Sequence, residues 1–264
     1  MSARSILSVP IRRLAAGGTT EGQDLVAVEE PLEIRIGASN VAITMRTPGQ
    51  DAELAAGFLF TEGIVPQGEI ASIDCDRNTA TVTLTSGAEL DASRMGRNFY
   101  VSSSCGVCGK ASIEAIESAG CVTLPRDVPQ VSPAVLRSLP AKLRDAQRVF
   151  DRTGGLHACG LFTAQGDLLL VREDVGRHNA VDKLIGRACL DNQLPLSDKL
   201  LMLSGRTSFE LVQKAVMGGI PVVAAVGAPS SLAVKTALRF GMTLIGFLRD
   251  DRYNVYSSPA RLTA

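Results

Sequence analysis

The sequence has 264 residues, of which 45% are hydrophobic, and its 27 basic residues balance its 27 acidic residues. A chain of this size and composition can bury a substantial core as one large domain or as two modest ones. The balanced charge excludes a whole-chain attraction to nucleic acid or to an anionic membrane, so any anion site must be local.

The N-terminus and the cysteines indicate the cellular compartment. The first ten residues lack the apolar core of a signal peptide. No later run approaches the roughly 18 apolar residues that a membrane-spanning helix needs. Four of the six cysteines, Cys75, Cys121, Cys159 and Cys189, are scattered singly and predict inert, mostly buried thiols. We therefore expect a soluble, cytoplasmic protein without a disulfide framework.

The first part of the chain predicts a small sheet and one helix. Short β-like runs separated by turn residues occupy residues 6 to 47. A helix is predicted over 51–63, because Asp51 can cap it and an apolar stripe follows. Two more strands are predicted over 69–74 and 80–84. The polar stretch 91–110 predicts a loop that carries a Cys-x-x-Cys pair.

The second part of the chain has the alternating pattern that is typical of a layered α/β domain. Helices are predicted over 132–148, 178–188, 208–217 and 231–240, and strands over 156–163, 168–172, 199–204, 221–226 and 243–248. The change of pattern predicts two domains, 1–127 and 128–264.

Four polar segments follow strands of this second domain and should meet at one sheet edge, where open α/β sheets bind ligands. The segments are 173–179, 204–208, 227–231 and 249–252. Free N–H groups at helix starts favour anions, so the serines, threonines and arginines of these segments are candidate phosphate ligands. Taken singly, Asp174, Ser208 and Ser231 are better explained as helix caps or turn residues.

The cysteine pair, Cys105 and Cys108, has three readings from its spacing alone. A structural zinc site would need two more ligands recruited from separate places, such as Cys75 or His157. A thioredoxin-type dithiol would sit at a helix start after a strand, whereas this pair follows three serines. A persulfide carrier needs a mobile, activated thiolate, which flanking glycines and Lys110 favour, with the second thiol to resolve or share the sulfur.

Five motifs in consistent order give the chain a specific resemblance. They are Phe60–Ile64, Ser103–Lys110, Thr153–Ala158, Glu173–Lys183 and Ser204–Ser208. Through them the chain resembles the FdhD family of formate dehydrogenase accessory sulfurtransferases. The resemblance implies an α/β fold: a three-layer cytidine-deaminase-like domain with a smaller N-terminal β-rich α+β domain.

The resemblance implies that sulfur comes from a cysteine desulfurase as a cysteine persulfide and passes to the molybdenum or tungsten bis(molybdopterin guanine dinucleotide) cofactor of formate dehydrogenase. Cys105 would be the carrier and Cys108 its partner. The implied cofactor-binding stretch is Phe247, Leu248, Arg249, Asp250, Asp251 and Arg252. We add Arg206 and His178 from their positions at strand ends. A homodimer is implied, and neither nucleic acid nor a membrane is an expected partner.

Two other functions are weighed against sulfur transfer. One is a non-catalytic chaperone that binds the cofactor and delivers it. The other is a zinc-dependent deaminase-like hydrolase, which needs His-x-Glu and Pro-Cys-x-x-Cys at two helix starts. Ala180 stands where that glutamate would be, and 204–211 has no cysteine. We therefore expect no intrinsic metal. His157 is as well explained by hydrogen-bonded packing as by function.

Overall fold

The computed structural model describes residues 5–86, 99–101 and 124–263. The cysteine pair, Cys105 and Cys108, and also Cys121 lie outside these described residues. Within the described ranges no helix is long and apolar enough to cross a membrane.

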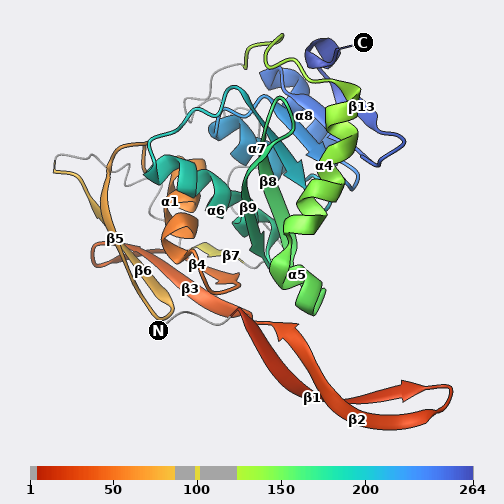
Figure 1. Ribbon diagram of the computed structural model, residues 1–264. Coiled ribbons are helices and arrows are strands. Elements are labelled where there is room, and N and C mark those ends of the chain that lie inside the picture. The colour runs from red at the N-terminus through yellow and green to blue at the C-terminus, as the bar shows by residue number, and fades with distance from the viewer. Residues whose placement is uncertain (1–4, 87–98, 102–123, 264) are drawn as a thin grey trace.

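The C-terminal part of the molecule is a six-stranded sheet between two layers of helices (Figure 1). Its strands, in spatial order, are β13 (Asn254–Ser257), β12 (Thr243–Gly246), β11 (Val222–Ala225), β10 (Lys199–Leu203), β8 (His157–Thr163) and β9 (Leu168–Asp174). Strands β10, β11 and β12 are parallel to one another, whereas β8 and β13 run antiparallel to their neighbours. The helices are α4 (Pro133–Ala146), the short α5 (Arg148–Thr153), α6 (Arg177–Leu190), α7 (Phe209–Met217) and α8 (Ser231–Phe240).

Alternation along the strands divides the core between the two faces of this sheet. On β10, Leu201 and Leu203 pack with apolar residues of α6, α7 and α8. Leu200 and Met202 point the other way and pack with the buried leucines of α4. This is the three-layer arrangement predicted from the sequence, and a close structural likeness reported below confirms the fold class.

The N-terminal part contains a five-stranded sheet covered by one helix. Its strands, in spatial order, are β5 (Ile70–Asp76), β6 (Thr79–Leu84), β3 (Glu30–Ile36), β4 (Ser39–Arg46) and β7 (Phe99–Val101). Helix α1 (Asp51–Thr61) packs on this sheet through Leu54, Phe58 and Leu59. Asp51 does not cap α1 as predicted; Gln50 precedes the helix in a left-handed conformation, and the Asp51 carboxylate binds Arg46 instead.

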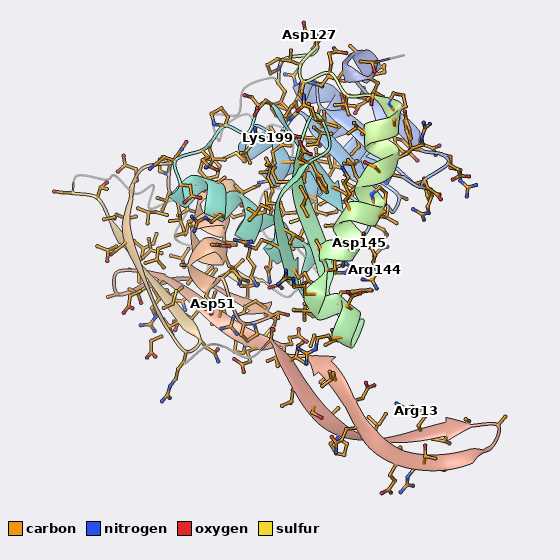
Figure 2. All side chains as sticks on the ribbon, viewed as in Figure 1. Arg13, Asp51, Asp127, Arg144, Asp145 and Lys199 are labelled. Carbon is orange, nitrogen blue, oxygen red and sulfur yellow. The ribbon has the colours of Figure 1, made fainter. Side chains whose placement is uncertain are left out.

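A separate hairpin, β1 (Ile6–Ala15) and β2 (Gly18–Ala27), extends away from the rest of the molecule, with Arg13 on it (Figures 1 and 2). The prediction of a single small sheet over residues 6 to 47 was therefore wrong, since among the described strands these two pair only with each other. Most of their side chains are exposed, and Leu14 is 76% exposed.

Helix α1 of the N-terminal part crosses helix α6 of the C-terminal part at two glycines. A Cβ atom on Gly57 would lie 1.9 Å from the carbonyl oxygen of Asp182, and one on Gly186 would lie 1.8 Å from that of Glu53. Since only glycine lets the two backbones come this close, these residues fix how the two parts are joined.

Candidate functional site

The four predicted polar segments meet at the edge formed by the carboxyl ends of β10, β11 and β12. Strand β9 is antiparallel to β8, which is antiparallel to β10, so β9 also ends at this edge. The segment 204–208 is hydrogen bonded to the segment 226–230: the N–H of Gly227 donates to the Gly205 carbonyl and that of Ser230 to the Thr207 carbonyl. The predicted convergence of the segments is thus present in the described structure.

Both histidines of the chain lie at this edge, together with two arginines. Strand β8 runs antiparallel to β10, so its first residue, His157, lies at the edge where β10 ends. The ring of His157 lies against Gly205. Burial lowers the pKa of His157, and the charges of Arg177, His178 and Arg206 lower it further, while Asp174 opposes them weakly. His157 is therefore a neutral ring in a cationic neighbourhood at pH 7.

Helices α6 and α7 both begin here without a side-chain cap. Gly176 precedes α6 and has no side chain to offer. Ser208 precedes α7, but its hydroxyl is 3.1 Å from Nε2 of His178 rather than on the helix backbone. Helices α4 and α8, in contrast, are capped by Ser132 and Ser230. The first N–H groups of α6 thus keep a field that favours anions, whereas the first turn of α7 already holds the carboxylate of Glu210.

Glu210 lies in the first turn of α7, and its carboxylate is 3.7 Å from Nε2 of His178. The hydrogen bond with His178 is the main cause that lowers the pKa of Glu210 to about 2, with partial burial opposing it and Ser208 adding to it. Glu210 is therefore ionised at neutral pH and orients the His178 ring.

Two polar atoms near this edge are buried without a hydrogen-bond partner among the described residues: Nε of Arg177 and Oγ1 of Thr207. Thr207 is 1% exposed and precedes Ser208, the residue before α7. A buried polar group without a partner is costly, so such atoms often mark the place of a ligand or water.

The predicted cofactor stretch 247–252 follows β12 and has a mixed character. Phe247 is 44% exposed and has a positive φ, whereas Leu248 is fully buried in the core against α4. Nη1 of Arg249 donates to the carbonyl oxygens of Val226 and Leu248, each at 2.8 Å. A cavity of about 280 Å³ is lined by Phe247, Arg249, Arg252 and Asn254. Asp250 and Asp251 are exposed beside it.

A second cavity, of about 460 Å³, lies at the same edge on the side of α4. Phe150, His157, Ser204 and Val226 are among its lining residues, and Arg144 lies over the ring of Phe150. The carbonyl oxygen of Val226 accepts a hydrogen bond from Arg249, so a residue that lines one cavity is bonded to a residue that lines the other. Each cavity therefore has an aromatic side chain, Phe247 or Phe150, among its lining residues.

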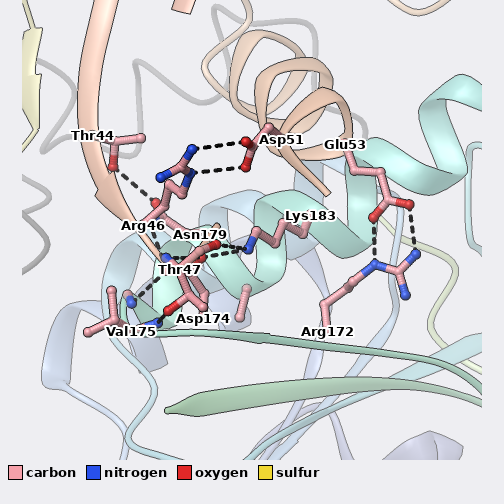
Figure 3. A network of polar contacts seen from close by, with 12 residues as sticks. Thr44, Arg46, Thr47, Asp51, Glu53, Arg172, Asp174, Val175, Asn179 and Lys183 are labelled. Carbon is pink, nitrogen blue, oxygen red and sulfur yellow. Dashed lines mark hydrogen bonds and ion pairs between the residues drawn. The ribbon is translucent and has the colours of Figure 1, made fainter. Parts of the chain in front are cut away.

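Most of the motif 173–183 fastens the two parts of the molecule together (Figure 3). Nζ of Lys183 lies 2.7 Å from the Asp174 carboxylate and donates to the carbonyl oxygen of Thr47. Asn179 donates to both Asp174 and the Met45 carbonyl. Two other residues of the motif, Arg177 and His178, lie at the sheet edge instead.

Two further buried pairs join the same two parts. Nζ of Lys214 contacts Asp182, Thr61 and Glu62 at 2.9 to 3.0 Å. Burial raises the pKa of Asp182 although Lys214 opposes it; the acidic partners raise the pKa of Lys214 against the effect of burial. Arg172 binds both oxygens of Glu53.

The described cysteines are free thiols. Cys159 and Cys189 are buried as predicted, and burial raises the pKa of both. Cys75 is exposed on β5, which corrects the prediction for this residue; partial burial and then Asp51 and Asp74 raise its pKa. No group of three metal-ligating side chains occurs within the described ranges.

Sequence reasoning singled out His178 and Arg206, included Arg177 and Thr207 among the candidate phosphate ligands of the strand-end segments, and left His157 open. Arg177 follows Gly176 in a motif that had been noted, so a helix start without a capping side chain was the available signal. Nothing in the local sequence places His157 beside Gly205, because that contact depends on the antiparallel pairing of β8 with β10.

Known proteins similar to this one match it along nearly the whole chain. The FdhD/NarQ family matches residues 27–263. The sulfur carrier protein FdhD of Mycolicibacterium paratuberculosis is 51% identical over 263 residues, covering 96% of this chain and 97% of that protein. The protein of the same description from Sulfolobus acidocaldarius is 43% identical over 261 residues, covering 97% and 98%.

A solved structure is also similar. It is the crystal structure of a candidate formate dehydrogenase accessory protein from Desulfotalea psychrophila, with a TM-score of 0.80 and 27% identity. The likeness covers 98% of this chain and 100% of that one.

Proposed function

The chain belongs to the FdhD/NarQ family, and from this premise we propose that it is a cytoplasmic sulfur carrier that serves formate dehydrogenase. The observation that carries the proposal is the identity of about half of all residues, over nearly the full length, to relatives described as sulfur carrier proteins. The likeness to a candidate formate dehydrogenase accessory protein supports the choice of formate dehydrogenase as the enzyme that this carrier serves.

In the proposed reaction, the sulfur travels on Cys105. The Cys105 thiolate attacks the terminal sulfur of a persulfide on a cysteine desulfurase; one S–S bond forms, another breaks, and the donor cysteine leaves as a thiolate. Attack of the Cys108 thiolate on the inner sulfur of the Cys105 persulfide then forms a disulfide and releases sulfur at the oxidation level of sulfide. The two cysteines supply both electrons for this release.

The acceptor in this proposal is the molybdenum bis(molybdopterin guanine dinucleotide) cofactor, which is the substrate of the transfer. Arg177, Arg206 and the first turn of α6 supply the positive potential that its phosphates need. The exposed Phe247 offers an aromatic surface to a base. These features support a nucleotide site at the sheet edge.

Mass spectrometry of the intact protein tests the sulfur-carrying step. After incubation with a cysteine desulfurase and cysteine, the wild-type protein should gain the mass of one sulfur atom, removable by a thiol reductant. The Cys105→Ala variant should gain none, because it lacks the accepting thiolate. Cys75→Ala is the matched control, since it removes an exposed thiol outside the pair, and it should load as the wild type does.

The alternative function is a chaperone that binds the cofactor without chemistry. It predicts guanine-nucleotide binding with no sulfur gained by the wild-type protein. That result, or full loading of the Cys105→Ala, Cys108→Ala variant, would reject the sulfur carrier. Metal analysis separates the deaminase-like hydrolase, which requires one tightly held zinc ion per chain.

A further inference from the structure

We infer that the outer edge of strand β2 is a docking surface for an extended, basic segment of another protein, which adds to the hairpin β1–β2 as a third strand. The chemistry of this partner is a strand that carries lysine or arginine and has no proline where it pairs. The hairpin extends away from the rest of the molecule (Figure 1). Its docking role is therefore independent of sulfur transfer and of the ligand at the sheet edge.

The hairpin lacks the packing that normally stabilises two paired strands. Each strand has 10 residues, and among the described strands the two pair only with each other. At the root of the hairpin Ala27 lies against Gly155, whereas every side chain of β2 from Gly18 to Asp24 is exposed. An isolated two-stranded hairpin is marginally stable in water, and a third strand stabilises it. A partner strand would therefore supply what this hairpin lacks.

The register of the hairpin determines which backbone groups point outward. The N–H of Val28 donates to the Ser5 carbonyl at 3.0 Å, so the ladder begins with a hydrogen-bonded pair. Antiparallel pairs alternate between bonded and non-bonded, and the register from there to the turn is unbroken. The backbone groups of the non-bonded pairs point away from the ribbon; these pairs include Ser8–Leu25, Pro10–Gln23 and Arg12–Glu21.

The two outer edges of the hairpin differ in their ability to pair. Pro10 has no N–H, so the edge of β1 lacks a donor near its middle, which is a common protection against pairing. Strand β2 contains no proline. The outward N–H groups of Glu21 and Gln23 have no partner among the described residues, whereas that of Leu25 donates to the Asp24 carboxylate at 2.9 Å. The edge of β2 is therefore the one that can accept another strand.

The charges on β2 favour a basic partner. Its charged side chains are Glu21 and Asp24. Glu21 lies 3.4 Å from Arg12, but Asp24 lies opposite Val9 and has no basic partner among the described residues. A strand with lysine or arginine beside Asp24 would compensate this charge.

A second copy of the chain is a poorer occupant of this edge. Its own β2 would bring the same two carboxylates and no basic side chain. Its β1 would present the edge that Pro10 interrupts. A different protein therefore fits the edge better than a second copy does.

Fluorescence polarisation of a labelled peptide tests the docking surface on the full chain at fixed ionic strength. The probe has about nine residues, in which lysine and threonine alternate. Gln23→Pro should weaken its binding by about tenfold or more, because the outward donor is lost and a ring occupies the edge. Asp24→Asn should weaken it by about two- to fivefold, because the charge is lost while an acceptor for the Leu25 N–H remains. The same peptide with glutamate in place of lysine should not bind.

Ser8→Pro is the matched control. Ser8 also belongs to a non-bonded pair, but it lies on the edge of β1, and the hydrogen bond from its hydroxyl to Gln23 at 3.1 Å is lost in both proline variants. This variant should bind the lysine peptide as the wild type does. Hydrogen exchange locates the peptide: it should slow the N–H groups of Glu21 and Gln23 and leave that of Arg12 unchanged.

Protection of the bonded pair Ile11–Gly22 shows whether each variant keeps the hairpin. If Gln23→Pro loses it, Asp24→Asn and the comparison of the two peptides decide. Equal binding of the lysine and glutamate peptides would overturn the inference, and so would unchanged exchange at Glu21 and Gln23. Sedimentation tests the other occupant: if Gln23→Pro separates wild-type oligomers into monomers while Ser8→Pro does not, the edge belongs to a second copy and the inference is overturned.

Discussion

Lys183 and Asp174 are 1% and 0% exposed, and each is the other's counter-ion. Removing both charges of such a pair is often tolerated, whereas removing one leaves an uncompensated charge in a low-dielectric interior. The pair also holds the backbone at Thr47 in the N-terminal part. Single residues of the motif 173–183 should therefore matter more to folding than to ligand contact.

We expect Lys183→Met to lower the free energy of unfolding by about 3–5 kcal/mol, because Asp174 stays buried without its counter-ion. Urea unfolding followed by circular dichroism measures the change. Lys199→Met is the control: Lys199 pairs with Asp198, whose side chain is 73% exposed, so the loss should stay below about 1 kcal/mol. Equal losses in the two variants would contradict the role given to the buried pair.

Helices α1 and α6 are in contact through backbone rather than through side chains at Gly57 and Gly186. Alanine is normally preferred to glycine inside a helix by about 1 kcal/mol. At Gly57, however, the added methyl group would meet the Asp182 carbonyl at 1.9 Å. The tertiary contact, not helix propensity, therefore decides which residue is tolerated here.

Gly57→Ala should destabilise the protein by about 3 kcal/mol or more, since the two helices must move apart and disturb the buried ion pairs beside them. Thermal and urea unfolding measure the loss. Gly17→Ala is the control, because a Cβ atom there meets nothing within 4 Å, and it should change stability by less than about 0.5 kcal/mol. A neutral Gly57→Ala would mean that the helices are not in this close contact.

Elements with a strong hydrophobic period were predictable from the sequence, and elements without one were not. Helix α8 and strand β11 lie within one or two residues of the predicted 231–240 and 221–226, because their apolar faces match the layers that bury them. Strand β13 and hairpin β1–β2 were missed in whole or in part. Their side chains are largely exposed, so pairing rather than burial defines them.

At the scale of the whole molecule, half of the candidate site was predictable. His178 and Arg206 follow strands, and the meeting of strand ends at one sheet edge is a general property of this fold. Arg177 and Thr207 were predicted only as members of these segments; that Nε of Arg177 and Oγ1 of Thr207 are buried without a described partner was not predictable, because it depends on the tertiary structure. The packing of the two parts against each other also depends on tertiary contacts that the local sequence does not reveal, such as the hydrogen bond from Lys183 to Thr47.

Hydrogen exchange should show one cooperative unit that spans both parts. The contacts of Lys183 with Thr47, of Lys214 with Glu62 and of Arg172 with Glu53 join the two parts, as does the α1–α6 crossing. Strands β3 and β6 should exchange with the same free energy as β10 and β11, and Lys183→Met should lower both values equally. The hairpin β1–β2 should exchange far faster, since it has almost no buried side chains. Separate, weaker protection of β3 and β6 would show that the N-terminal part unfolds independently, contrary to this expectation.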